Sequence, residues 1–214
     1  MRLIDQYRPR TYQSIVGNKK TVDRIYRAVD DNDGFGGLVI MLLGKTGNGK
    51  TLLADIIARD INGDLYRPDC TKDAETAVAI DQARRDITQN SMFCNQSVYV
   101  FDEADKLHPD NIAKLKTMID VIDRRRQENL PCNVTVIFTS AKSKSQLTIT
   151  QQGHWDELCS RCITCKMEIL PVELDEYFSA LTGGEVPEIS KCIAVRSMRS
   201  AWAYIEDNEI GIEG

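Results

Sequence analysis

The stretch of sequence best suited to chemistry is residues 44–51, Gly-Lys-Thr-Gly-Asn-Gly-Lys-Thr. It fits the pattern G-x-x-x-x-G-K-[ST], whose glycines let backbone N–H groups wrap phosphate oxygens without clashes from Cβ atoms. A helix that begins at this loop would add partial positive charge at its N-terminus. The pattern therefore predicts a site for a nucleoside triphosphate. Its expected ligand-binding residues are Gly44, Lys45, Thr46, Gly47, Asn48, Gly49, Lys50, Thr51 and Leu52.

Two side chains of this loop and two acids further along the chain could divide the chemistry between them. Lys50 would neutralise the β- and γ-phosphates, and Thr51 would be a ligand of Mg²⁺. Asp102 and Glu103 follow the apolar run 98–101. One acid there suits Mg²⁺, held directly or through water, and we assign that role to Asp102. Glu103 is then free to polarise an attacking water, which favours hydrolysis over transfer to an organic acceptor.

A third polar pair, Thr139-Ser140, follows the apolar run 134–138. A hydroxyl at the end of this strand could hold the attacking water or touch the γ-phosphate, and we assign the role to Ser140. Serine is common after strands, so an ordinary turn is the alternative.

Alternating strands and helices must position these motifs. Short continuous apolar runs predict buried strands, and amphipathic spacing predicts helices. His154 and Trp155, in residues 154–158, are expected to pack a loop, and a contact with a partner is the alternative. The expected strands are 38–43, 64–69, 97–105, 132–142 and 162–169, and the expected helices are 19–30, 52–61, 74–89 and 110–127.

This alternation implies right-handed crossovers, a mostly parallel sheet and helices on both of its faces. The expected fold class is α/β with a five-stranded parallel sheet. Ligands bind outside the carboxyl ends of such strands, so the three polar motifs should meet at one edge. After a boundary near Lys166–Pro171 the sequence indicates two or three helices. We predict a nucleotide-binding core over residues 1–168 and a small helical lid over residues 169–214.

Composition and charge limit the class of protein. The chain is 42% hydrophobic and 28% charged, which is typical of a globular protein. No apolar run approaches the ~20 residues of a membrane span, the N-terminus lacks the apolar core of a signal peptide, and seven cysteines suit reduced thiols. We therefore expect an intracellular protein with no membrane contact. Residues 167–214 hold 10 acids and 3 bases of the 32 and 27 in the chain, so nucleic acid could only meet a local basic patch.

A permanent cation, Arg161, stands between two cysteines in residues 156–165, Asp-Glu-Leu-Cys-Ser-Arg-Cys-Ile-Thr-Cys. An arginine suits an anion such as a phosphate. The cysteine spacing suggests a zinc site instead, although no second C-x-x-C pair supports it. A third interpretation is buried thiols beside an ordinary surface arginine. The zinc ligands would be Cys159, Cys162 and Cys165, with either Cys192 or His154 as the fourth.

With these motifs in this order, the sequence resembles the AAA+ ATPases, and among them the small subunits of sliding-clamp loaders of the replication factor C type. Residues 7–20, beginning Tyr-Arg-Pro, resemble the box with which clamp loaders contact adenine. Residues 101–105, Phe-Asp-Glu-Ala-Asp, match the family's second nucleotide motif. Residues 159–162 contain its Ser-Arg-Cys motif, and residues 195–202 occupy the place of its second sensor. The resemblance spans about residues 5–206.

The resemblance assigns roles to individual residues. It implies that Arg161 reaches the ATP of a neighbouring subunit and acts on it in trans, and that Arg199 is the arginine of the second sensor. Ser140 stands where the family usually has asparagine at its first sensor. The residues implied to line the base pocket are Arg8, Pro9, Val16 and Gly17.

The same resemblance suggests a contact with nucleic acid. Residues 80–87, Ile-Asp-Gln-Ala-Arg-Arg-Asp-Ile, resemble a family helix whose arginine meets template phosphates. Arg84 is the candidate, with Arg85 beside it, and contacts of this kind give affinity without reading sequence. A solvated charged helix face is the alternative. Further cations that could join them are Lys114, Lys116, Arg124, Arg125 and Arg126.

The implied protein is an ATPase that uses ATP and Mg²⁺ and works in an oligomer with other clamp-loader subunits. It would couple ATP turnover to the binding of a sliding clamp and of primer–template DNA. Its expected location is the cytoplasm or the nucleoid or nucleus, and a viral origin is compatible with its compact size. The lid is expected to be short and the family's helical collar to be absent. Two alternatives remain open: a structural subunit that binds ATP without hydrolysing it, and another DNA-directed motor such as a branch-migration helicase.

Overall fold

The structure, a computed structural model, describes residues 2–32, 36–88, 96–142, 146–147, 149–186, 188–192, 195 and 197–212, with the backbone alone at 149–151. Its centre is a sheet of five parallel strands in the order β2-β3-β4-β1-β5. This confirms the predicted fold class. The strands are β1 (Val39–Leu43), β2 (Asp64–Tyr66), β3 (Ser97–Phe101), β4 (Val134–Ser140) and β5 (Ile163–Lys166).

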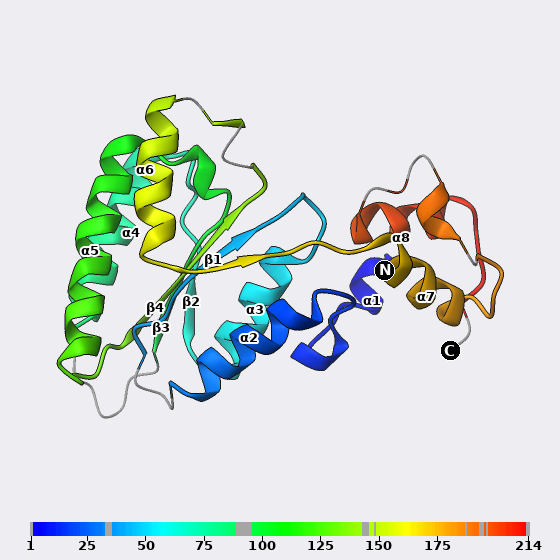
Figure 1. The fold of residues 1–214 in the computed structure, drawn as a ribbon, viewed down its shortest axis with the longest axis horizontal. Coiled ribbons are helices and arrows are strands. Elements are labelled where there is room, and N and C mark those ends of the chain that lie inside the picture. Colours follow the sequence, from blue (N-terminus) through cyan, green and yellow to red (C-terminus); the bar gives the residue numbers. More distant parts are fainter. Residues whose placement is uncertain are drawn as a thin grey trace.

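Helices cover both faces of the sheet, as predicted (Figure 1). Side chains of successive strand residues point to opposite faces, so Met41 packs with one group of helices and Ile40 with the other. Both side chains are fully buried. On the Ile40 face lie α2 (Lys19–Asp30) and α3 (Lys50–Asp60), and on the Met41 face lie α4 (Asp73–Asp86), α5 (Pro109–Gln127) and α6 (Ile149–Ser160).

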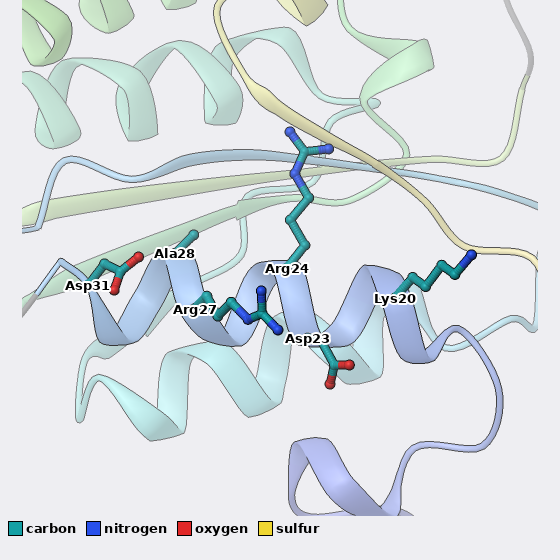
Figure 2. A pocket seen from close by; sticks show the side chains of 6 residues that line it. All are labelled: Lys20, Asp23, Arg24, Arg27, Ala28 and Asp31. Atoms are coloured by element: carbon teal, nitrogen blue, oxygen red, sulfur yellow. The ribbon is translucent and has the colours of Figure 1, made fainter.

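The open edge of the sheet, at β5, is bound by side chains of α2. Arg24 donates from Nη1 to the Thr164 carbonyl at 3.1 Å, and Thr21 donates to the Lys166 carbonyl at 2.8 Å. Figure 2 shows Arg24 pointing from α2 toward this strand. Such contacts occupy backbone groups that would otherwise be free to pair with another strand. A hollow of about 420 Å³ on this surface is lined by Lys20, Asp23, Arg24, Arg27, Ala28 and Asp31.

The prediction of a loop at residues 154–158 was wrong, because α6 runs through them. Trp155 is 4% exposed and Leu158 is fully buried, and both join the core on the side of α5. Tertiary packing therefore stabilises a helix whose own sequence has a weak helical pattern. All five predicted strands were also longer than the strands of the structure. β2 ends at Tyr66, two residues before Pro68, which lacks an N–H to donate to a ladder.

A separate helical layer follows the sheet and has a small core of its own (Figure 1). Phe178 is fully buried, and its ring meets that of Trp202 edge to face at 5.0 Å. Tyr7, from the N-terminal segment, stacks on Trp202, and the two ring centroids lie 5.3 Å apart. The N-terminal segment therefore packs on this lid. The lid consists of α7 (Pro171–Leu181), the 3₁₀ helix η4 (Ile189–Lys191) and α8 (Met198–Asp207), and α1 (Leu3–Gln6) of the N-terminal segment packs on it. The 3₁₀ helix η1 (Tyr12–Ser14) packs on α2 instead.

Across the described ranges, no helix combines the length and the apolar character that a bilayer span requires. The six cysteines among the described residues carry free thiols.

The lid core generates a stability prediction. Phe178→Ala removes a fully buried ring and should lower the free energy of unfolding of the lid by about 3–5 kcal/mol. Val172→Ala, on the same helix but 54% exposed, should cost less than about 0.5 kcal/mol. Urea unfolding followed by the fluorescence of Trp202, in a Trp155→Phe background, measures both. Equal losses from the two variants would contradict the packing described above.

Candidate active site

The glycine-rich loop lies where the sequence places it, between the end of β1 and the start of α3. Gly47 and Gly49 have φ angles of 88° and 84°, which side chains with a Cβ rarely adopt. A Cβ on Gly47 would also lie 2.5 Å from Oγ of Ser197 in the lid. The loop can therefore keep both its conformation and its contact with the lid only with glycine at this position.

Lys50 begins α3 and turns its ammonium group back to the loop. Its Nζ donates to the carbonyls of Gly44 at 2.7 Å and Lys45 at 2.9 Å, and the residue is 8% exposed. Burial lowers the pKa of Lys50, while the nearby carboxylates of Asp102 and Asp105 oppose that change. A phosphate group in the loop would give this buried cation the counter-charge that two neutral carbonyls do not supply.

Asp102 joins the ends of three elements. The Thr51 hydroxyl, on α3, lies 3.2 Å from both oxygens of the Asp102 carboxylate, which follows β3. The Thr139 hydroxyl, on β4, donates to the same carboxylate and accepts the Glu103 N–H at 3.1 Å. The hydroxyl of Thr51 and the carboxylate of Asp102 are hard oxygen ligands of the kind Mg²⁺ prefers, and they already lie together. The residues therefore fit a magnesium ion beside the phosphate loop.

Glu103 holds an uncommon backbone conformation at the mouth of the site. Its φ is 54°, in the left-handed region, and its side chain is 57% exposed and paired with Lys106. Its carboxylate is thus placed toward water rather than toward the core, next to the half-buried Asp102.

Ser140 is fully buried and its hydroxyl points away from the cavity. It donates to Oδ1 of Asp105 at 2.9 Å, and the ammonium of Lys142 lies 3.3 Å from the other oxygen of that carboxylate. Thr139, its neighbour, faces the cavity instead. Side chains alternate along a strand, so only one of the two hydroxyls can face the ligand. Thr139 is therefore a site residue to which the sequence alone gave no separate role.

One cavity of about 860 Å³, between the sheet and the lid, brings most of the predicted residues together. Arg199 reaches it from the lid, so both layers contribute to its wall. Of the predicted binding residues, Gly17, Gly44 and Lys45 do not line it, and neither do Ser140 and Arg161. The predicted residues that do line it are Arg8, Pro9, Val16, Thr46, Gly47, Asn48, Gly49, Lys50, Thr51, Leu52, Asp102, Glu103 and Arg199.

The cavity wall also contains charged residues that the sequence did not single out. Arg67, just after β2, pairs with Asp55 on α3, and Arg8 donates to the other oxygen of Asp55 at 2.7 Å. One carboxylate thus holds two arginines from distant segments at the rim of the cavity. No short-range pattern in the sequence signals this cluster, because its members lie far apart in the chain.

Arg161 lies at the opposite end of the strands from the phosphate loop. That loop follows the carboxyl end of β1, whereas Arg161 precedes the start of β5, which runs parallel to β1. Figure 1 shows β5 running from the end of α6 toward the lid. The Arg161 guanidinium donates from Nε to Asp120 at 2.8 Å and from Nη1 to the Glu157 carbonyl at 2.8 Å. It is thus held away from the cavity of its own chain.

The zinc interpretation finds no support in the described part of the chain. Cys159 and Cys162 pack on the α5 side of the sheet, whereas Cys165 belongs to the core on the α2 side. Cys192 is part of the lid. Within the described residues, no three His, Cys, Asp or Glu side chains are grouped so that they could hold a metal.

The predicted DNA-binding cations differ in what they contact. Arg84 is half-buried on α4, and Arg85 is bound to Gln82 at 2.7 Å. Lys116 pairs with Glu157, and Arg125 donates to the Pro131 carbonyl at 2.7 and 2.9 Å. Lys116 and Arg125 therefore serve contacts within the chain.

Comparisons with known proteins place this geometry in context. The large subunit of replication factor C from Methanosarcina acetivorans is 34% identical over 113 residues, 49% of this chain and 18% of the relative. The small subunit from Sulfolobus acidocaldarius is 24% identical over 212 residues, 94% of this chain and 63% of the relative. This chain thus spans less than two thirds of the length of these relatives.

Two solved structures share the fold. The Thermotoga maritima RuvB Holliday junction branch migration motor matches with a TM-score of 0.66 and 18% identity, over 94% of this chain and 64% of that one. The replication initiator DnaA, bound to AMPPCP and single-stranded DNA, matches with a TM-score of 0.60 and 13% identity, over 94% and 64% of the two chains.

The family is shown by a match to a family model rather than by any single relative. The model described as ATPase family associated with various cellular activities (AAA) matches residues 40–150, which include the phosphate loop, Asp102, Glu103 and Thr139. These residues make up more than half of the 214 in the chain. The chain therefore belongs to the AAA family of ATPases.

Proposed function

We propose that this chain is an ATP-hydrolysing subunit of a DNA-replication sliding-clamp loader, active at the contacts between subunits. One observation carries the proposal. The cavity contains the phosphate loop, the Thr51 and Asp102 side chains that suit Mg²⁺, and the exposed Glu103. Arg161 lies at the far end of the sheet. A site divided in this way suits a subunit that lends its arginine to a neighbour. The alignment of 94% of the chain with a replication factor C small subunit supports the same function.

The residues of the cavity have distinct roles in this function. The loop amides and Lys50 would bind the phosphates, and Thr51 and Asp102 would hold Mg²⁺, which would supply positive charge beside the phosphates. Glu103 accepts a hydrogen bond from the attacking water and polarises it. Arg199, on the lid, would pair with the phosphates, and this contact would couple the position of the lid to the nucleotide in the cavity.

Arg161 completes the site of the neighbouring subunit. Its guanidinium is a permanent cation that can donate two hydrogen bonds to phosphate oxygens as negative charge spreads over the transferring γ-phosphoryl group. Hydrolysis then depends on the contact between two subunits. In a clamp loader this dependence would couple ATP turnover to the grip on clamp and primer–template DNA.

A second candidate is a structural subunit that binds ATP without hydrolysing it. The orientation of Ser140 favours it, because this hydroxyl is bound to Asp105 and does not reach the cavity. Glu103 lines the cavity with an exposed carboxylate that can polarise water, and for this reason we prefer the hydrolysing subunit.

Glu103→Gln tests the chemistry. The change keeps shape and volume but removes the carboxylate that polarises water, so the assembled complex should bind ATP normally and hydrolyse it at least ~10²-fold more slowly. Release of phosphate, in the presence of clamp and primed DNA, is the measurement. Lys106→Ala is the matched control, because it removes the partner of Glu103 and leaves the carboxylate in place. A wild-type complex that turns over no faster than Glu103→Gln would favour the structural subunit.

Arg161→Ala tests the division of the site between subunits. The variant should bind ATP with unchanged affinity as a single chain, because Arg161 does not line its own cavity. In the assembled complex it should slow hydrolysis by about 10²-fold or more, since trans arginines contribute ~10³–10⁵ where best studied. Mixing Arg161→Ala with Glu103→Gln subunits should restore part of the activity, because some contacts then pair an intact arginine with an intact site. No recovery in rings shown to contain both variants side by side would exclude a trans role.

Arg84→Ala tests the contact with DNA. Removing one phosphate contact should weaken binding to primed DNA similarly for all sequences. It should also make the plot of log K against log salt concentration less steep by about one unit. Fluorescence anisotropy over a range of salt concentrations measures it. Arg125→Ala is the control, since this arginine is bound to a backbone carbonyl and should leave the slope unchanged. A loss confined to one DNA sequence would contradict a role in binding the phosphate backbone.

A further inference from the structure

The contact between α5 and the end of α6 contains two ion pairs of opposite orientation. Lys116 and Asp120 lie one turn apart on α5, and Glu157 and Arg161 lie one turn apart at the end of α6. Lys116 pairs with Glu157, and Asp120 pairs with Arg161. Each helix thus presents one cation and one anion, and a shift of one turn would place like charges together.

The Asp120 pair restrains Arg161 and leaves part of its guanidinium for another partner. Two donors are used, Nε to the Asp120 carboxylate and Nη1 to the Glu157 carbonyl, each at 2.8 Å. Among the described residues no hydrogen bond involves Nη2. The Arg161 side chain is 32% exposed and that of Asp120 is 54% exposed, so the pair lies at the surface and a phosphate of a second chain can approach it.

We propose that Asp120 is a positioning residue for Arg161, which it holds at the subunit surface with Nη2 ready to donate to a phosphate oxygen of the neighbouring subunit. This inference rests on the proposed trans role of Arg161. Asp120 touches neither nucleotide nor reacting atoms in this arrangement, and acts only through the arginine.

The physical reason is the freedom of the arginine side chain. An unrestrained arginine samples many rotamers, and ordering it in the transition state costs entropy that a preformed hydrogen bond has already removed. The bond to Asp120 uses Nε–H, whereas Nη2 keeps an N–H on the edge that it shares with Nη1, so the arginine can donate there without breaking the bond to Asp120. A competing role, in which Asp120 withholds Arg161 from the phosphate, would require that bond to break first.

Asp120→Ala in the assembled complex tests the inference, with Lys116→Ala as its matched control. Both variants truncate one charged side chain of α5 and break one of the two ion pairs with α6. We expect Asp120→Ala to lower kcat for ATP hydrolysis by about tenfold, as misplaced catalytic groups do, with KM and ATP affinity unchanged. Lys116→Ala should leave kcat within about twofold, since exposed ion pairs contribute little to stability. Asp120→Glu, which keeps the charge, should restore part of the loss.

Arg161→Ala, measured in parallel, separates the inference from the proposed function. If Arg161→Ala slows hydrolysis and Asp120→Ala does not, the positioning role is wrong and the trans arginine stands. If Arg161→Ala itself has no effect, both fall. An increase in kcat for Asp120→Ala would show that Asp120 withholds the arginine, and equal losses from Asp120→Ala and Lys116→Ala would show a packing role alone. In the Arg161→Ala background, Asp120→Ala should cause no further loss.

Discussion

The carboxylate of Asp102 is the point on which the candidate site depends. It accepts hydrogen bonds from Thr51 at the start of α3 and from Thr139 near the end of β4, and it follows β3 itself. Three segments from distant parts of the chain are thereby fixed at one edge of the sheet. Because parallel strands place their carboxyl ends together, this carboxylate can be reached from the phosphate loop without a long connection.

The glycine-rich loop adds a second constraint, which concerns the lid. Gly47 leaves no room for a side chain against Ser197, and Arg199, two residues further along the chain, lines the cavity. The lid is also bound to the N-terminal segment through the stacked rings of Tyr7 and Trp202. A movement of the lid would therefore affect both the phosphate loop and the N-terminal segment, which line the cavity together.

Local patterns predicted the parts of this molecule that depend on local interactions. The helix predicted at 19–30 coincides with α2, and the phosphate loop lies between a buried strand and a helix as its pattern requires. What the sequence could not predict depends on contacts between distant residues. The helix at Trp155 exists because it packs on α5, and the pairing of Asp55 with Arg8 and Arg67 joins three segments. The choice between Thr139 and Ser140 depends on which face of β4 meets Asp102, which the sequence leaves open.

The cations at the two ends of the sheet, Lys50 and Arg161, differ in burial and in their partners. At the carboxyl end, Lys50 is buried and its ammonium group donates to two neutral carbonyls, so a phosphate in the loop would add a direct ion pair. At the other end, Arg161 already has an acid, Asp120, and lies at the surface. A cation that is paired and exposed can be shared with a second molecule at little cost in desolvation, whereas the buried Lys50 cannot. Under the proposed function, this difference would allow one chain to keep the charge of Lys50 for its own site and to offer that of Arg161 to a neighbour.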